Sequence, residues 1–257
     1  YVGGIIVRIA TYNIWNSAIG MPERKQQLIE EIIKISADII CLQEVPNKAA
    51  HQDLVERCRY QFAVFHEHAN EEEGLSILSR YSIKSFEYDQ NCIFAKIEIQ
   101  NKTLLLINTH LPWDSAVNRE LVVLNVMEKI EGISSDYVIF LGDFNCSERS
   151  GVNQFLLGEL TLKGRDCGKN WYDLAEAYAE RHNIATDNTL DIKSNPRWKG
   201  LKSIEVSRRY DRILVRNTYP MDLPILEKCE TFGRTISEKS GYAASDHYGV
   251  YADLYFI

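Results

Sequence analysis

The sequence predicts an α/β sandwich, in which two layers of β-sheet are covered by helices. Three observations support this prediction. Short apolar segments typical of strands occur in both halves of the chain, periodic segments typical of helices lie among them, and there is no internal repeat or low-complexity tract. The 257 residues, 45% of them hydrophobic, suffice for one large core without a shift in composition, so we expect a single domain over residues 1–257.

The expected elements follow one another along the chain. Residues 5–12 are expected to form a strand, and the periodic apolar residues after Pro22 predict a helix with this proline in its first turn. Apolar segments predict strands over 38–42, 75–78, 92–99, 103–109 and 137–141, and residues 117–130 predict a helix. Helices are expected near 152–157 and 171–181, then a segment of weak periodicity over 187–209. Strands are expected again over 211–215 and 248–256.

The charge and cysteine content exclude several classes of protein. A net charge of −7 does not suit tight binding along a nucleic acid duplex, although a small or locally held phosphate substrate still fits. No apolar run approaches the roughly 20 residues of a membrane span. Six scattered cysteines without a CxxC pair favour a reducing, cytoplasmic setting, although a leader trimmed from the chain is compatible with the sequence. No protein partner is indicated.

Polar residues stand at the ends of strand after strand. Aspartate and asparagine are common in turns, which explains one or two of these positions, but glutamate and histidine are not turn residues. We therefore expect the side chains to converge on one site. They are Asn13 after the first strand, Glu44 in LQE, His110 in NTH, Asp143 and Asn145 in GDFN, Asp211 in YDR, and Asp246 and His247 in SDH.

These residue types restrict the chemistry. Carboxylate and amide oxygens without a thiolate select Mg²⁺, Mn²⁺ or Ca²⁺ rather than zinc. Histidines can donate to a developing oxyanion or protonate a leaving group. Together these groups predict the hydrolysis of a phosphate ester.

The motifs TYN, LQE, NTHL, GDFN, YDR and SDH, in this order between residues 11 and 247, closely resemble the endonuclease/exonuclease/phosphatase superfamily. The resemblance implies a four-layered α/β/β/α sandwich of the DNase I type, with the site at one end of the packed sheets. The segment TLDIKSNPRW over 189–198 is most similar to the 5′-tyrosyl-DNA phosphodiesterase-like bacterial branch, although the first motif is TYN where that enzyme typically has TWN.

The resemblance also implies a metal site. Glu44 would be the principal ligand of Mg²⁺, for which Mn²⁺ would be able to substitute. Asn13 would contact the metal or the phosphate, and Asp246 would complete the acidic cluster.

The remaining roles that the resemblance implies are catalytic. Asp143 would orient or deprotonate the attacking water, with Asn145 holding the phosphate. His247 would stabilise the pentavalent transition state, paired through its other nitrogen with Asp211. Asp211 could instead pair with one of the arginines beside it in the sequence.

His110 would be a second phosphate contact or the acid for the leaving group. A carboxylate in EEEG would orient it, for which Glu73 fits better than its neighbours Glu71 and Glu72. The alternative is that the three glutamates form a solvated acidic loop.

Two further candidates concern substrate binding. Arg197 lies in a basic segment that is either a solvated loop or a lip that steers phosphates and stacks on bases. Trp113 is either a residue that stacks on the substrate or a half-buried packing residue. The basic residues of the segment are Lys193, Arg197, Lys199, Lys202, Arg208 and Arg209.

The sequence thus predicts a Mg²⁺-dependent phosphoesterase, and it leaves the substrate open. One alternative is a phosphodiesterase that acts on nucleic acid ends. Another is a phosphatase or phosphodiesterase of a small sugar, inositol or lipid phosphate. A noncatalytic binding module on the same fold is disfavoured, because Glu44, Asp143 and His247 are all present.

Overall fold

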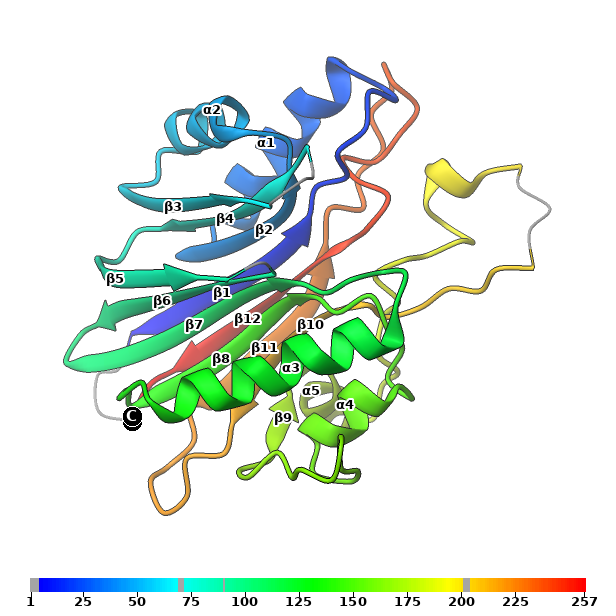
Figure 1. Cartoon of the computed structure of the whole chain (residues 1–257). Coiled ribbons are helices and arrows are strands. Elements are labelled where there is room, and N and C mark those ends of the chain that lie inside the picture. The colour runs from blue at the N-terminus through cyan, green and yellow to red at the C-terminus, as the bar shows by residue number, and fades with distance from the viewer. Residues whose placement is uncertain (1–4, 69–71, 90, 201–203) are drawn as a thin grey trace.

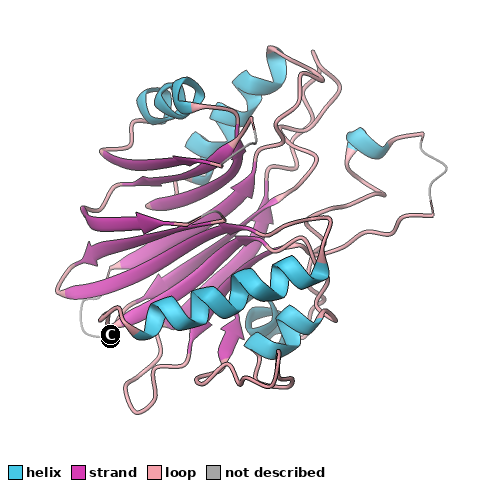
Figure 2. Cartoon of the chain, viewed as in Figure 1, coloured by secondary structure: helices cyan, strands magenta, loops and turns pink. Residues whose placement is uncertain are grey.

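Two six-stranded β-sheets pack face to face, and helices cover both outer faces (Figure 1). This is the arrangement in a computed structural model that describes residues 5–68, 72–89, 91–200 and 204–257. Helix, sheet, sheet and helix form four successive layers (Figure 2). The predicted α/β/β/α sandwich is therefore confirmed.

The first sheet contains both ends of the described chain. Its strands, in spatial order, are β11 (Ile225–Phe232), β12 (Gly249–Tyr255), β1 (Ile6–Asn13), β2 (Ile39–Val45), β4 (Gly74–Ser79) and β3 (Phe62–Glu67). Strand β1 is central, antiparallel to β12 and parallel to β2. Helices α1 (Glu23–Ile35) and α2 (Lys48–Cys58) pack on the outer face through one apolar cluster.

The second sheet is built from the middle of the chain. Its strands, in spatial order, are β5 (Ile83–Tyr88), β6 (Cys92–Ile99), β7 (Lys102–His110), β8 (Tyr137–Asp143), β10 (Asp211–Arg216) and β9 (Trp171–Asp173). Helices α3 (Ala116–Glu131) and α4 (Gly151–Leu156) cover its outer face. Helix α5 (Leu174–His182) contacts β10 and β11, one strand of each sheet.

The core between the sheets follows the two-residue period of the strands. On β8, for example, Tyr137, Ile139 and Leu141 face the opposite sheet, and Asp143 is the next residue on that face. Each central strand continues in this way from apolar residues to polar ones at the same end of the sandwich. The site is therefore the polar continuation of the inner core.

Two expected elements differ in the structure. Residues 171–181 are not one helix, because Trp171–Asp173 pairs with β10 as a short strand. Asp173 then caps α5, since its Oδ1 accepts hydrogen bonds from the backbone N–H groups of Ala175 and Glu176. Pro22 is the N-cap residue of α1 and not part of its first turn.

Other elements carry little sequence signal. Strand β5 is mostly exposed, and helix α2 buries only His51 and Leu54, so neither shows the apolar periodicity that predicts an element. Residues 187–200, drawn in yellow, extend away from the right-hand end of the sheets and contain the short 3₁₀-helix η1 (Pro196–Trp198) (Figure 1). Within the described ranges, no helix is long and apolar enough to cross a bilayer.

Candidate active site

Strand register brings the polar ends together. In the second sheet His110 is opposite Asp143, and Asp143 is opposite Asp211, so three neighbouring strands present these side chains side by side. In the first sheet Asn13 is opposite Gln43, and Glu44 follows directly. Because the sheets pack face to face, the two rows meet at one end of the sandwich.

A layer of amides lies directly beneath the site. Gln43 Nε2 donates hydrogen bonds to Thr11 Oγ1 at 3.0 Å and, across the interface between the sheets, to Asn108 Oδ1 at 2.7 Å. Asn108 Nδ2 donates back to the carbonyl oxygens of Leu42 and Ser76 in the first sheet. These buried polar groups therefore satisfy one another.

Asn13 links the two sheets within the site. Its Nδ2 donates to Glu44 Oε1 at 2.8 Å and to Asp143 Oδ2 at 3.0 Å, while its Oδ1 accepts the backbone N–H of Trp15. The side chain is fully buried. Asn13 thus presents its donor, and not its oxygen, to the two carboxylates.

Glu44 is held at both carboxylate oxygens. Asn13 binds Oε1, and the backbone N–H of Asn16 donates to Oε2 at 2.9 Å. The backbone at Glu44 has φ +58°, a left-handed conformation that is unusual for a side chain of this kind at a strand end. Local strain therefore accompanies the turn of this carboxylate into the site.

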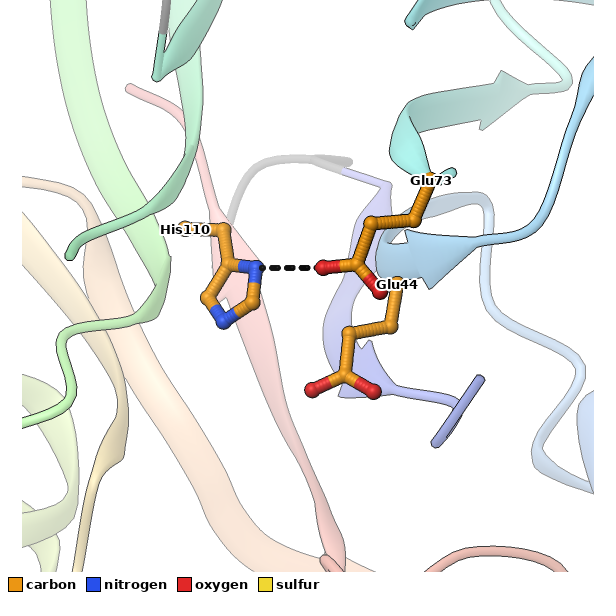
Figure 3. Close-up of side chains that lie close together, drawn as sticks. All are labelled: Glu44, Glu73 and His110. Atoms are coloured by element: carbon orange, nitrogen blue, oxygen red, sulfur yellow. Dashed lines mark ion pairs between the residues drawn. The ribbon is translucent and has the colours of Figure 1, made fainter. Parts of the chain in front are cut away.

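His110 points toward the carboxylate of Glu73, with Glu44 nearby (Figure 3). Its Nδ1 is 3.6 Å from Glu73 Oε1, and its Nε2 is 3.7 Å from Asp143 Oδ2. Asn16 also reaches this region, donating from Nδ2 to the carbonyl oxygen of Glu72. The structure thus places Glu73 beside His110, and Glu71 lies outside the described residues.

Asp143 is the centre of the site. Besides the bond from Asn13, its Oδ1 accepts the backbone N–H of Asn145 at 2.8 Å. Asn145 adopts φ +47° and donates from Nδ2 to the carbonyl oxygen of Leu111, which follows His110. The GDFN turn is therefore folded around the Asp143 carboxylate.

His247 and Asp211 form a buried pair. His247 Nδ1 lies 2.8 Å from Asp211 Oδ2 and 3.9 Å from Asp143 Oδ2. The neighbouring Arg209 instead binds Asp173 and Glu176, so the alternative of a structural pair with this arginine does not hold.

Burial and charge act in opposite directions on these groups. Burial would lower the pKa of His247, but the carboxylates of Asp211 and Asp143 raise it well above its usual value. Burial would raise the pKa of Asp143, but His247 and His110 hold it below the usual range. Burial raises the pKa of Asp211. At neutral pH a protonated His247 therefore faces two buried carboxyl groups.

Asp246 adds further negative charge beside the site. Burial raises its pKa to about 6, His247 lowers it, and Glu44 raises it. Among the described residues, two groups of side chains have ligand atoms close enough together for a metal ion: Glu44, Glu73 and His110 in one, and Asp143, Asp211 and His247 in the other. Asp246 belongs to neither group, although the charge of Glu44 raises its pKa.

The residues fit a hard divalent cation. The donors around Glu44 are mainly carboxylate oxygens, with one histidine and no thiolate. Burial is the main cause of the raised pKa of Asp246, and the negative charge of Glu44 raises it further. A divalent ion at Glu44 would offset this charge.

Arg197 lies on the Asp246 side of the site. Its guanidinium carbon is 5.5 Å from the ring centre of Trp15 and 5.0 Å from that of Trp198, so two indole rings flank it. Asn195 anchors this segment, because its Nδ2 donates to the carbonyl oxygen of Ser245. Lys202, from the same basic run, lies outside the described residues.

Trp113 lies on the His110 side. It is 79% exposed, so the alternative of a half-buried packing residue is wrong. With His110, Glu73 and Asp114 it lines a surface groove of about 540 Å³. The site thus has a basic, aromatic side at Arg197 and a more acidic groove at Trp113.

Sequence analysis missed several residues that shape the site. The backbone N–H of Asn16 binds the carboxylate of Glu44. Ser245 Oγ accepts a hydrogen bond from the backbone N–H of His247 and donates one to the carbonyl oxygen of Asn13. The serine of the SDH motif was the available signal for Ser245. A backbone contact such as that of Asn16 leaves no signal in the sequence.

Comparison with known proteins places these features in context. The model of the Endonuclease/Exonuclease/phosphatase family matches residues 10–247. A curated protein from Vairimorpha ceranae, the probable CCR4-Not complex 3′-5′-exoribonuclease subunit Ccr4, is 23% identical over a match that covers 66% of this chain. The chain spans only about half of that protein, 47% of its length.

Solved structures share the fold over nearly the whole chain. TDP2 from D. rerio, complexed with a single-strand DNA product, superposes with a TM-score of 0.78 and 20% identity, covering 98% of this chain and 99% of that one. Truncated TDP2 from Caenorhabditis elegans gives 0.75 and 18%, covering 98% of each chain. A functionally unknown conserved protein from Enterococcus faecalis gives 0.70 and 18%, covering 96% and 99%.

Proposed function

Because the chain belongs to the endonuclease/exonuclease/phosphatase family and is a phosphoric ester hydrolase, we propose that it cleaves its substrate by metal-assisted in-line attack of water. The observation that carries the proposal is the convergence of Asp143, His247 and His110. Ligand atoms of both histidines lie within 4 Å of one carboxylate oxygen, Asp143 Oδ2. A base and two proton donors are thus assembled around one point.

The residues would divide the work as follows. Asp143, whose pKa is held low, accepts the proton of the attacking water and orients it. Protonated His247 donates to a non-bridging phosphate oxygen as negative charge develops, while Asp211 fixes the ring through Nδ1. His110, beside Glu73, donates to the leaving group or the phosphate, and Asn145 contacts the phosphate next to Asp143.

Glu44 would hold a divalent cation, for which we propose Mg²⁺, with Mn²⁺ as a substitute. Asp246, which lies outside the two groups of close ligand atoms, would complete the acidic cluster beside the ion. When bound, the ion supplies charge neutralisation of the phosphate. The orientation of Asn13 indicates that this residue positions Glu44 and Asp143 through its amide nitrogen, and it is the weakest of the proposed metal contacts.

For the substrate we propose a nucleic acid end, which would lie between Arg197 and Trp113. The support is the flanked guanidinium beside Asp246 and the fold similarity to a TDP2 that binds a single-strand DNA product. A small sugar, inositol or lipid phosphate is the second candidate, favoured by the net charge of −7.

All six cysteines are free thiols, which supports a reducing, cytoplasmic setting.

A substrate panel tests the proposal. Hydrolysis of bis-p-nitrophenyl phosphate, a 5′-tyrosyl oligonucleotide, single-stranded DNA and RNA, and inositol or sugar phosphates would be measured with Mg²⁺, with Mn²⁺ and with a chelator. Asp143→Asn serves as the blank. We expect metal-dependent turnover that the variant loses, with an oligonucleotide as the best substrate. Turnover that persists in the chelator would contradict the metal, and preference for a small phosphate would contradict the nucleic acid end.

A further inference from the structure

Arg24 occupies an unusual position in helix α1. The side chain is only 1% exposed, although it carries a charge. A guanidinium has five N–H donors, and here each of them reaches a different backbone carbonyl oxygen. Nε donates to Ile19, one terminal nitrogen to Ile14 and Ala244, and the other to Trp15 and Ser17, at 2.6–3.2 Å.

Four of these carbonyls belong to the segment that follows β1. This segment begins directly after Asn13, and its Asn16 N–H binds Glu44 Oε2. The ring of Trp15 also stacks on Arg24, with 4.3 Å between the guanidinium carbon and the ring centre. Arg24 therefore fixes the backbone that holds the Glu44 carboxylate.

The fifth carbonyl belongs to the other end of the chain. Ala244 precedes Ser245, whose Oγ donates to the carbonyl oxygen of Asn13 and accepts the N–H of His247. Asp246 lies between these two residues. One buried side chain thus joins the segment that binds Glu44 to the segment that carries Asp246 and His247.

We propose that Arg24 is a positioning residue, which sets the location of Glu44 relative to Asp246 and His247 by clamping the two segments together. The inference rests on the proposed function, because it assigns Arg24 a role in metal binding at that same site. It touches neither substrate nor metal. Its charge lies near those of Asp246 and Glu44, so it also offsets part of the repulsion between them.

The test compares two conservative variants. Arg24→Lys keeps the charge but has a single nitrogen with three donors, so at least two buried carbonyls lose their partners. Arg8→Lys is the control, because Arg8 likewise donates to a backbone carbonyl and lies over an aromatic ring, but it pairs with Asp253 near the opposite end of β1. The Mn²⁺ dissociation constant would be measured by calorimetry, kcat and KM with bis-p-nitrophenyl phosphate, and the midpoint of thermal unfolding for each protein.

We expect Arg24→Lys to bind Mn²⁺ roughly tenfold more weakly and to lose about 10- to 100-fold in kcat at saturating metal, as displaced catalytic groups do. KM should change little. Arg8→Lys should lower the unfolding midpoint but leave both values within about twofold of the unsubstituted protein.

Folded Arg24→Lys with unchanged Mn²⁺ affinity and kcat would overturn the inference. So would a failure of both Arg24→Lys and Arg24→Gln to fold while Arg8→Lys folds, since Arg24 would then serve stability alone. Failure of the unsubstituted protein to bind Mn²⁺ would instead refute the proposed function, which keeps the two conclusions separate.

Discussion

Asp211 Oδ2 lies 2.8 Å from His247 Nδ1, and neither side chain is more than 8% exposed. The pair stands at the junction of the two sheets, with Asp211 at the start of β10 and His247 just before β12. At a position so well shielded from solvent, a charged imidazolium is stable only beside negative charge. The carboxylates therefore keep His247 protonated as well as oriented.

Replacing Asp211 by asparagine should remove that support. The effect of burial would then outweigh that of the remaining carboxylates, so the pKa of His247 should fall. The fraction of enzyme with a protonated His247 at neutral pH should fall with it. We expect kcat to drop about 10²- to 10⁴-fold, the usual range for a lost acid or base. NMR titration of the His247 ring would measure the pKa in both proteins. An unchanged pKa would show that Asp143 alone maintains the charge.

Thr189 supports the same aspartate from behind. Its buried Oγ1 accepts two backbone N–H groups, those of Tyr210 and Asp211. Thr189→Val leaves both without a partner, so we expect a loss of about 2–4 kcal/mol in the free energy of unfolding, and a lower kcat because Asp211 can shift. Denaturant titration measures the loss. Thr189→Ser keeps the oxygen and should retain most stability; equal losses in the two variants would implicate the methyl group instead.

The contribution of His51 to stability should fall as the pH falls below 6.5. Burial lowers its pKa from 6.5 to about 4, and its Nδ1 lies 2.7 Å from Ser76 Oγ. Between these values the unfolded chain binds the proton and the folded chain does not, so this contribution is complete above pH 6.5 and disappears toward pH 4. It amounts to about 3 kcal/mol.

Denaturant titrations from pH 4 to 8 would test the role of His51. His51→Gln cannot titrate, so its stability should depend less on pH than that of the unsubstituted protein, whatever its absolute value. Identical pH slopes in the two proteins would mean that His51 titrates normally.

Arg197 should matter for a polynucleotide and not for a small ester. With an oligonucleotide substrate, Arg197→Ala should raise KM several-fold and reduce the slope of log KM against log salt by about 0.7, the value of one phosphate contact on a single strand. KM for bis-p-nitrophenyl phosphate should stay within about twofold. Lys84→Ala, on the edge strand β5, is the charge-matched control. Equal losses on both substrates would mean that Arg197 shapes the site rather than contacting the chain.

Sequence reasoning reached the site because one apolar strand after another ends on a polar side chain. Asn13, His110 and Asp143 are the last residues of β1, β7 and β8, and the register of β7 and β8 sets His110 opposite Asp143. The supporting contacts could not be predicted. The carbonyls bound by Arg24 and the N–H of Asn16 are backbone groups, whose use depends on how distant segments meet. The exposed strand β5 could not be recognised in the sequence for a different reason, since it lacks an apolar face.

The amide bridge between Gln43 and Asn108 has a consequence for how the halves of the site stay aligned. Dispersion and burial have no direction, so two apolar faces in contact are aligned only by the shapes of their packed side chains. A hydrogen bond between two buried amides does have a direction, and breaking it would leave its donor and acceptor unpaired, at a cost of about 1–3 kcal/mol for each group. The bridge therefore fixes the alignment of the two sheets one layer below the place where Glu44 and Asp143 face each other across Asn13.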